Sequence, residues 1–372
     1  MEIKIARTEI LKGLSLIQSI VERKTTMPIL ANALLEAGKK TLSITATDLE
    51  VGVNCSYAAD VLSDGKVTVH AKSLYDIVKE LPEETVHFTT KDGNWVEICC
   101  GKSKFRIVGL SSDEFPKLPT RGTGETQRID ATILNEMIDK TAFAMSSDET
   151  RYNLNGVYTD FSGGEDGKTV LMVATDGHRL SVVKRQAGTK WDFPKGTIIP
   201  RKGVMELRRL TETGPAESSI DLWADKKQII AYRDNTTLVI RLIDGQFPPY
   251  EQVIPKRSKR TVAINRSMLI HALKRVSVLS TDRARGVKFA FSPNNLDISA
   301  SNPDLGEAKE ELAAEYKGEA FDVGFNAKYF IDALSSINDE QAILQLGDET
   351  SPCVISSEYD RNFTHVIMPM RL

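Results

Sequence analysis

The chain has 372 residues, enough for two or three domains of roughly 150 residues each, and its 41% hydrophobic and 27% charged residues are ordinary for a soluble globular protein. No run approaches the ~18 consecutive apolar residues of a transmembrane helix, and the first ten residues lack the apolar core of a signal peptide. The formal net charge of −3 gives no sign of a polyanionic partner by itself, so the distribution of charge has to be considered separately.

The cysteines and histidines exclude several kinds of site. The four cysteines show no C-x-x-C spacing and the five histidines are scattered, whereas a zinc site needs closely spaced ligands. No dinucleotide fingerprint occurs, and no carboxylate cluster suggests two-metal catalysis. We therefore expect reduced thiols in a cytoplasmic protein that needs neither a metal nor a cofactor.

Hydrophobic periodicity predicts the same succession of elements along the whole chain. A short strand leads into an amphipathic helix, and strands with alternating apolar residues follow, as in "RTVAIN", then residues 266–280, then "GVKFAFS" and "LDISAS". This succession predicts an α+β fold, in which helices cover one face of antiparallel sheets. The expected helices span residues 8–24, 72–80, 132–145, 201–210, 266–276 and 328–337.

The chain also repeats itself. The segments "LSITATDLE", "LMVATDGHR" and "LDISASNPD" place Asp48, Asp176 and Asn302 at intervals of 128 and 126 residues. A lysine near the start of the next expected helix recurs at intervals of 130 and 126, and "DEFPKLP", "GQFPPYEQVIP" and "HVIMPMRL" close the three units. Such ordered recurrence predicts three homologous domains, each built from two strand–helix half repeats. The aligned lysines are Lys72, Lys202 and Lys328.

Two polar segments mark the junctions between these units. "PTRGTGETQ" and "PKRSKR" have the Gly- and Pro-containing character of linkers. The predicted domains are residues 1–124, 125–257 and 258–372.

The segment "ATDGHR" has the composition of a catalytic loop, in which Asp176 would orient His178 as the general base of a hydrolase. However, the residues before His178 recur in the other units where no histidine follows, which favours a scaffold role, with Asp176 satisfying the backbone of a turn. No G-x-S-x-G nucleophile motif occurs. The hydrolase remains the alternative function.

A second motif has the partial appearance of a phosphate-binding loop. "SGGEDGKTV", from Ser162 to Val170, lacks the first glycine of that loop, and it carries two carboxylates that would repel phosphate. A strand rather than a helix N-terminus follows it. The segment therefore indicates a hairpin turn.

Positive charge concentrates in the expected helices. Residues 201–210 and 266–276 each carry a net charge of +3, and the six helices together carry +6, so the rest of the chain carries −9. This segregation predicts a helical surface that faces a polyanion and an acidic exterior. No recognition helix or zinc finger accompanies it, so binding should be indifferent to base sequence.

The triplication, together with "RYNLNGV", "ATDGHRL", "IIPRKGV", "GQFPPY" and the ending "MPMRL", resembles the bacterial sliding clamps, the beta subunits of DNA polymerase III, over residues 1 to 372. The resemblance implies a non-enzymatic, cytoplasmic processivity factor. It implies a head-to-tail homodimer whose six domains form a ring, with helices lining the channel and sheets outside. A closed ring cannot leave the duplex sideways, so weak phosphate contacts permit sliding. A DNA-binding module that never closes a ring is a further alternative.

The resemblance also implies partners and sites. The partners are double-stranded DNA, a second copy of the chain, the polymerase III alpha subunit, clamp-loader subunits, and other polymerases and repair proteins that bind through short peptides; no membrane is involved. The implied DNA-facing residues are Lys24, Lys72, Arg151, Tyr152, Asn153, Arg201 and Lys202. Ring closure is expected to use Phe105 and Ile107 of one copy against Val278 and Leu279 of the other, unless these four belong to a single-domain core.

A peptide-binding pocket is implied where the strand end at 175–180 meets the carboxy-terminal tail. The tail is apolar and carries two flexible methionines, which suits a surface for varied ligands, although a buried terminal strand is the alternative. The implied pocket residues are Leu154, Thr175, Gly177, His178, Arg179, Leu180, Pro248, Val253, Asn326, Tyr329, Val366, Ile367, Met368, Pro369, Met370, Arg371 and Leu372.

Four residues depart from the pattern of the family. Asn153 replaces an aromatic residue of some relatives, Ala284 a larger residue, Gln252 a base and Pro352 a small polar residue. These departures predict a pocket rim of different shape and peptide preference, and they weaken the case for a stacking contact at Asn153.

Overall fold

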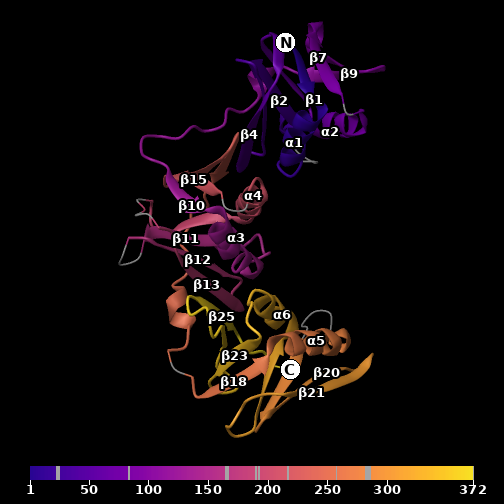
Figure 1. Cartoon of the computed structure of the whole chain (residues 1–372). Coiled ribbons are helices and arrows are strands. Elements are labelled where there is room, and N and C mark those ends of the chain that lie inside the picture. The colour runs from indigo at the N-terminus through magenta and orange to yellow at the C-terminus, as the bar shows by residue number, and fades with distance from the viewer. Residues whose placement is uncertain are drawn as a thin grey trace. The chain divides into compact units, whose positions relative to one another are not determined.

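The structure is a computed structural model of the chain (Figure 1), and it describes residues 1–21, 26–82, 84–163, 167–188, 191, 193–215, 218–256, 258–280 and 286–371. Lys24, Ala284 and Leu372 lie outside the described residues. The chain divides into two compact units. Unit 1 comprises Met1–Ala131 and Lys202–Leu242, and unit 2 comprises Thr132–Arg201 and Ile243–Leu372.

One order of elements occurs three times: strand, helix, three strands, and then the same again, with one extra short strand, β5, in the first repeat. The first repeat contains β1 (Glu2–Ala6), α1 (Arg7–Ile17), β2 (Asn32–Gly38), β3 (Thr41–Thr47), β4 (Val51–Ala58), β5 (Asp60–Ser63), β6 (Gly65–His70), α2 (Ala71–Glu80), β7 (Thr85–Lys91), β8 (Trp95–Cys100) and β9 (Ser103–Leu110). The second contains β10 (Gln127–Asp130), α3 (Ala131–Asp139), β11 (Gly156–Gly163), β12 (Thr169–Thr175), β13 (Arg179–Gln186), β14 (Thr197–Pro200), α4 (Arg201–Glu212), β15 (Ser219–Ala224), β16 (Gln228–Arg233) and β17 (Thr236–Arg241). The third contains β18 (Arg260–Asn265), α5 (Arg266–Val276), β19 (Gly286–Ser292), β20 (Asn295–Asn302), β21 (Gly306–Ala313), β22 (Phe321–Asn326), α6 (Ala327–Ser335), β23 (Gln341–Leu346), β24 (Cys353–Ser356) and β25 (Phe363–Ile367).

This order confirms the α+β fold and the two half repeats in each of the three repeats. Two helices are shorter than the periodicity predicts. The α-helix α1 ends at Ile17 instead of residue 24, where tighter i→i−3 bonds, such as Ile20 N to Ile17 O at 3.0 Å, take over. Likewise α3 ends at Asp139, and a separate 3₁₀ turn follows at Ala142–Ala144. β11 and β12 pair antiparallel, as a hairpin between them requires.

Unit 1 is built on one continuous sheet of thirteen strands, in the order β10-β15-β16-β17-β4-β3-β2-β6-β9-β8-β7-β1-β5. The first and second repeats join within it where β4 pairs antiparallel with β17, for example Val53 with Leu238. The helix α1 buries Ile10, Leu14 and Ile17 and packs against β3 and β4. Its 3.6-residue apolar spacing thus places one helix face on the sheet.

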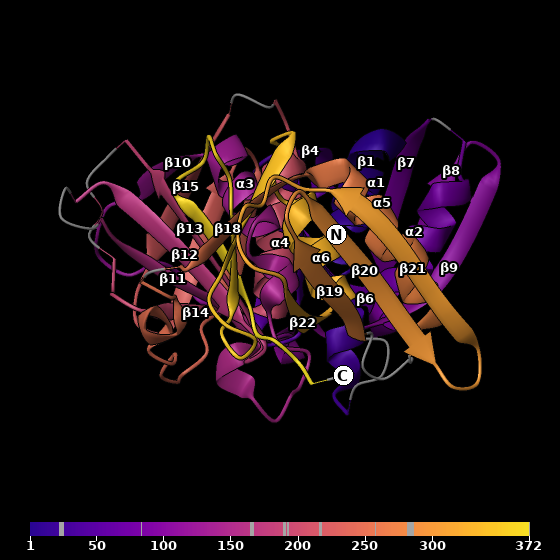
Figure 2. The ribbon, with the colours of Figure 1, turned by 90° about the horizontal axis from the view of Figure 1, so that it is seen from below.

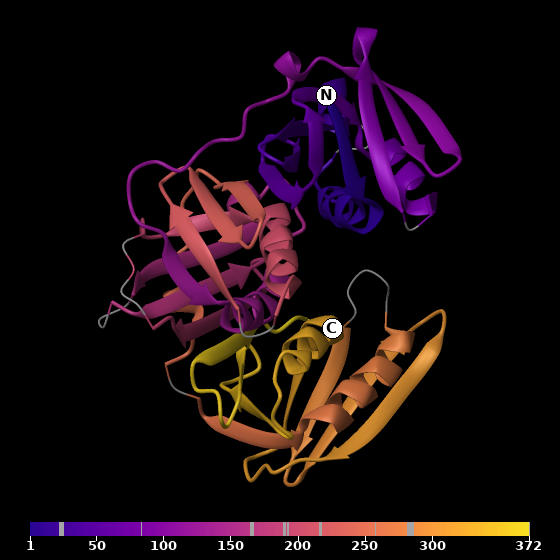
Figure 3. The same cartoon turned by 45° about the horizontal axis from the view of Figure 1, so that its top comes forward.

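Unit 2 contains an eight-stranded sheet, in the order β14-β11-β12-β13-β25-β24-β23-β18, and a four-stranded sheet, in the order β21-β20-β19-β22. The second and third repeats join where β13 pairs antiparallel with β25. Helices α5 and α6 of the third repeat contact each other and lie side by side on one face of their strands (Figure 3). The long hairpin of β20 and β21 ends the four-stranded sheet, with β21 at its edge (Figure 2).

The turn that follows the third strand of each repeat (β3, β12 and β20) is held by a side-chain oxygen of an Asp or Asn residue that accepts from the backbone. Asp48 Oδ1 accepts from Glu50 N and Val51 N at 2.9 and 2.7 Å. Asp176 Oδ1 accepts from the N–H groups two and three residues further on, at 2.9 and 3.0 Å. Asn302 Oδ1 accepts from the N–H two residues on, at 3.0 Å. The repeat predicted from the sequence is therefore present at atomic level, and the aspartates are turn-forming residues.

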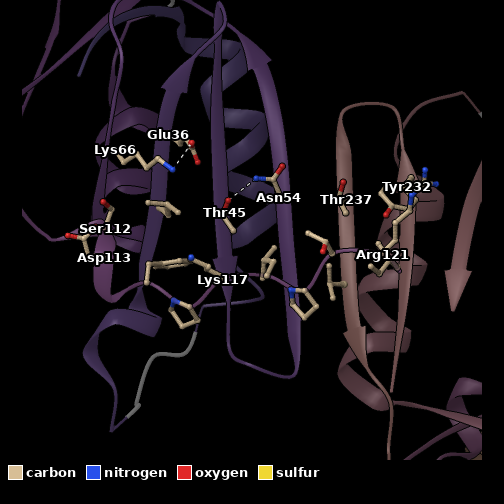
Figure 4. A pocket seen from close by; sticks show the side chains of 18 residues that line it. Glu36, Thr45, Asn54, Lys66, Ser112, Asp113, Lys117, Arg121, Tyr232 and Thr237 are labelled. Atoms are coloured by element: carbon tan, nitrogen blue, oxygen red, sulfur yellow. Dashed lines mark hydrogen bonds and ion pairs between the residues drawn. The ribbon is translucent and has the colours of Figure 1, made fainter. Parts of the chain in front are cut away.

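The linker that ends the first repeat lies across the outer face of the unit 1 sheet and forms one wall of a shallow groove there (Figure 4). Leu118 of this linker packs on a buried cluster of Trp223, Ile230 and Val239. A Cβ atom at Gly52 would overlap a methyl group of Leu118, so the glycine makes room for the linker. In the repeat alignment Gly52 corresponds to Leu180 of the second repeat and to Gly306 of the third.

We expect Gly52→Ala to lower the free energy of unfolding by about 1–3 kcal/mol, because the added methyl group overpacks the site of Leu118. In a Leu118→Ala background the same change should cost clearly less, which a double-mutant cycle in urea denaturation would measure. Gly38→Ala is the control, since its Cβ would have no neighbour closer than 4.0 Å. Additive costs of Gly52→Ala and Leu118→Ala would contradict this account of the glycine.

Candidate functional site

An apolar cluster lies at the junction of β13 and β25, where the sequence places the peptide pocket. Val173, Leu180, Val182, Val354 and Val366 form its buried part. Partly buried side chains pack against these five residues, among them Tyr158, Leu171, Phe247, Tyr250 and Ile254. The segment that carries Pro248 and Val253 therefore runs beside Leu180 and Val366, as the predicted pocket requires.

The carboxy-terminal tail combines the two roles that the sequence left open. Val366 and Ile367 are buried in β25, paired with Leu180 and Arg179 of β13. Beyond the strand, Met368 N donates to His178 O at 2.9 Å and Met370 N donates to Gly324 O at 2.9 Å. Met368 itself is 40% exposed. The strand part of the tail is thus core, and the residues after it provide an apolar surface.

Arg179 is an internal anchor beneath this surface, with a side chain that is 7% exposed. Its Nε donates to Asp176 Oδ2 at 3.0 Å, its Nη1 donates to Asp332 Oδ2 at 2.7 Å, and its Nη2 donates to the Phe143 carbonyl. The guanidinium carbon also lies 4.5 Å from the ring centroid of Tyr329. Since Asp332 and Tyr329 belong to α6, Arg179 ties the end of β13 to the third repeat.

The arrangement around His178 does not match a hydrolase. The Oδ1 atom of Asp176 accepts from the backbone N–H groups of His178 and Arg179, and its Oδ2 atom accepts from the Arg179 guanidinium. The aspartate thus holds the turn and the Arg179 side chain, and it does not orient the His178 imidazole as a catalytic acid would. His178 is exposed, and its carbonyl receives the tail amide.

Three further residues predicted for the pocket lie at the ends of strands. Leu154 is partly buried in a 3₁₀ turn, Tyr152–Leu154, just before β11. Asn326 is the N-cap of α6 and accepts from Lys328 N at 2.9 Å. Thr175 Oγ1 donates to Arg179 O at 2.6 Å and accepts from Gly177 N at 3.1 Å. These residues shape the turns around the pocket more than they present free polar groups to it.

The predicted DNA-facing residues fall into an exposed and an internal set. Lys72 is exposed on α2, and Arg151 and Tyr152 are exposed in the turn before β11, with Tyr152 at 58%. Arg151 Nη1 donates to Asp176 O at 3.2 Å, so it also supports the turn beside the pocket. Asn153 Nδ2 donates to Gln246 O at 3.0 Å.

Arg201 and Lys202, at the start of α4, have partners inside the protein instead. Arg201 Nε donates to Asn155 Oδ1 at 3.2 Å, and Nη2 donates to the carbonyls of Met145 and Ser146 at 2.9 Å. Lys202 forms an ion pair with Asp48. The DNA contact implied for these two residues remains a prediction. Several of their side-chain N–H groups already donate to atoms of the protein.

The residues expected at the ring interface lie on two exposed surfaces. Phe105 and Ile107 share one face of β9, where Phe105 is exposed and Ile107 half-buried. Val278, 72% exposed, and the half-buried Leu279 belong to a 3₁₀ turn after α5 that contacts β20 and β21. None of the four is buried in the core of a single domain.

Two features of unit 2 were missed by the sequence reasoning. Lys140, Glu136, Arg185 and Asp360 form a network in which Arg185 Nη2 lies 2.6 Å from Glu136 Oε1. The hydrogen bond from Arg185 lowers the pKa of Glu136. His365 on β25 is fully buried, and neither of its ring nitrogens has a hydrogen-bond partner. Arg185 and Glu136 are 49 residues apart in the sequence, and Lys140 and Asp360 are 220 residues apart. Partners so far apart leave no local pattern from which the network could be predicted.

In the part of the chain that the structure describes, no helix has the length and apolar character needed to cross a membrane. Among the same residues, no three His, Cys, Asp or Glu side chains gather as a metal site requires.

Comparisons with known proteins agree along the whole chain. Family models described as the N-terminal, central and C-terminal domains of the DNA polymerase III beta subunit match residues 1–119, 128–249 and 251–371. The chain is 36% identical to the beta sliding clamp of Caulobacter vibrioides and 35% identical to that of Pseudomonas aeruginosa, covering 100% of both chains in each case. A crystal structure of the C. crescentus beta sliding clamp, with polyethylene glycol bound to a putative beta-motif tethering region, matches with a TM-score of 0.95 at 34% identity over 100% of both chains. A Bartonella birtlesii sliding clamp bound to griselimycin matches with a TM-score of 0.95 at 33% identity, also over 100% of both chains.

Burial of His365 predicts a specific pH dependence of stability. Burial lowers the pKa of this imidazole from 6.5 to about 3, and the nearby Arg179 adds to the effect. Because the unfolded chain binds the proton more readily, stability should be full above pH 6.5 and fall as the pH drops towards 3, by up to about 5 kcal/mol. His365→Leu should flatten this fall in urea denaturation between pH 7 and pH 4.5.

The exposed His271 is the matched control, and His271→Leu should leave the pH dependence of the parent chain unchanged. A His365→Leu variant that loses stability with acid as steeply as the parent would contradict the assignment.

Proposed function

Because the chain belongs to the family of the bacterial DNA polymerase III beta subunit, the sliding clamps, we propose that two copies join head to tail and close around duplex DNA. The protein is a sliding clamp, a non-enzymatic processivity factor of DNA replication, and nothing supports the hydrolase alternative. The observation that carries this conclusion is the likeness over the full length of both chains, together with the three repeats. We place its action in the cytoplasm.

Two sheet edges support the proposed ring closure. Residues 103–108 of β9 pair with β8 on one side, whereas β6 pairs only with Gly109 and Leu110 on the other. β21 is the edge of the four-stranded sheet. Edge strands offer unpaired backbone groups to another chain, and pairing β9 of one copy with β21 of the other would satisfy both.

Side chains favour the same pairing. β9 carries Lys104 and Arg106, whereas β21 carries the exposed Glu307 and Glu311. Such opposite charges fix the register and the partner more than they add affinity. The apolar Phe105 and Val278 would supply buried area beside the paired strands.

For the contacts with DNA we propose the exposed residues Lys72, Arg151 and Tyr152, with Lys24 outside the described residues. Non-specific attraction between cations and phosphates suits a protein that must slide. For the peptide-binding pocket we propose the apolar cluster at the junction of β13 and β25, bordered by Val253 and Met368, as the docking site for polymerase, clamp-loader and repair proteins. Small apolar interfaces of this kind bind through a few well-buried anchors.

We expect the protein to remain on nicked circular DNA and to be lost when the circle is linearised, because a closed ring leaves only over an end. Val278→Glu should weaken the dimer and abolish retention on the circle, since a carboxylate would be buried at the interface. Leu62→Glu is the control, because Leu62 is likewise exposed but lies on β5, an edge strand separated from β9 by three other strands. Gel filtration of the protein–DNA complex before and after the circle is cut measures retention. Equal loss from both templates would refute the ring.

For the pocket, we expect Met368→Glu and Val253→Glu each to weaken binding of a fluorescent peptide that copies the clamp-binding tail of a polymerase III alpha subunit by about tenfold or more. Both residues are exposed, so folding and dimer formation should be retained. Tyr359→Glu, at an aromatic residue that is 83% exposed, should bind the peptide like the parent chain. Truncation from Val366 is a poor test, because it would remove part of β25. Unchanged affinity in both variants would refute this pocket.

A further inference from the structure

The lysines that the three repeats align have different surroundings. Lys72, at the start of α2, is exposed, and among the described residues no carboxylate lies within ion-pair distance of it. Lys328, at the start of α6, pairs with Asp332 one turn along its own helix, at 2.8 Å. Lys202, at the start of α4, instead reaches out of its repeat and is only 31% exposed.

The partners of Lys202 belong to the first repeat. Its Nζ donates to the carbonyl of Ile20, just after α1, at 3.0 Å, and to Oδ2 of Asp48. The Asp48 side chain is 4% exposed, and its other oxygen already accepts two backbone N–H groups of the turn. The lysine therefore neutralises a carboxylate that is almost fully buried.

This contact links helix α4 of the second repeat to the first repeat, close to the place where the strands of the two repeats also pair. The Asp48 turn connects β3 to β4, and β4 is the strand that pairs with β17 of the second repeat. Nearby, Arg209 of α4 donates to Ser19 Oγ and lies 3.4 Å from the buried carboxylate of Glu206. The Glu206 side chain is only 7% exposed, and this burial raises the pKa of its carboxyl group.

We propose that Lys202 is a positioning residue, which fixes the first turn of α4 to the end of α1 and to the Asp48 turn, and that it does not contact DNA phosphates. Paired with Asp48, it adds no net charge to the surface and would release no counterion from DNA. Its repeat counterpart Lys72 keeps the phosphate contact; that comparison rests on the proposed function. One position of an ancestral repeat thus serves two purposes in a single chain.

The test compares Lys202→Met with Lys72→Met in the full-length protein. The binding of a fluorescent duplex oligonucleotide is measured by anisotropy over a range of salt concentrations, and thermal unfolding is followed in parallel. Lys72→Met should reduce the slope of log K against log salt by about 0.9 per subunit and leave the melting temperature unchanged. Lys202→Met should leave the slope unchanged and lower the melting temperature, on the order of 5 °C or more, because Asp48 stays buried without its cation.

A double-mutant cycle makes the assignment specific. Asp48→Asn keeps the oxygen that accepts the turn amides but removes the charge that Lys202 neutralises. Its combination with Lys202→Met should cost clearly less than the two single changes together. Lys202→Arg, which retains the cation and its donors, should recover much of the melting temperature.

Three results are decisive. A reduced salt slope in Lys202→Met, whatever its stability, would overturn the proposal, and so would additive losses in the cycle with Asp48→Asn. An unchanged slope in both lysine variants, with stability lost in Lys202→Met alone, would support the positioning role and would instead refute Lys72 as a DNA contact.

Discussion

Pairing of backbone groups between strands of different repeats is the interaction on which the molecule depends. A strand at the edge of a sheet exposes N–H and C=O groups that need partners, and a single repeat of this kind has such edges on both sides. The pairing of β4 with β17 and of β13 with β25 satisfies them inside the chain. Residues 103–108 of β9 and the outer side of β21 stay open, in the first and the last repeat, and these are the two edges at which we propose that a second copy pairs.

The aspartate turn shows how one structural device acquires different connections. In the first repeat Asp48 holds its turn and receives Lys202 of the second repeat. In the second repeat Asp176 holds the same turn but receives Arg179, which reaches on to Asp332 of the third. The turn is the conserved part of the architecture within this chain, and the long side chains that meet it differ. Joints between repeats are thus made by a common backbone feature and individual ion pairs.

Much of this could be predicted from the sequence, because it is recorded locally. Helix periodicity, strand alternation and the repeated landmarks predicted the succession of elements. The residues around Asp176 recur in the other repeats without a histidine, which already favoured a turn over a catalytic site. The partners of Lys202, the burial of Arg179 and the unpartnered His365 could not be predicted, because each depends on residues brought together from distant parts of the chain. A basic residue at a helix start has the same sequence signature whether it faces DNA or a buried carboxylate. The ends of α1 and α3 were missed for a related reason, since apolar spacing continues past the last helical hydrogen bond.

Gly52 has a consequence for how many partners one molecule can hold. The two internal joints descend from the same design, yet the first repeat has a glycine where the second has Leu180, and the vacated space is filled by Leu118 of the chain's own linker. At the first joint the linker residue Leu118 covers the cluster of Trp223, Ile230 and Val239, whereas the strand β25 that pairs with Leu180 is followed by the exposed Met368. The two joints therefore differ in role: the first is covered by the chain's own linker, and the second is the one at which we propose that partner peptides bind. With the docking site that we propose at the second joint, a pair of subunits would present two such sites, one on each copy.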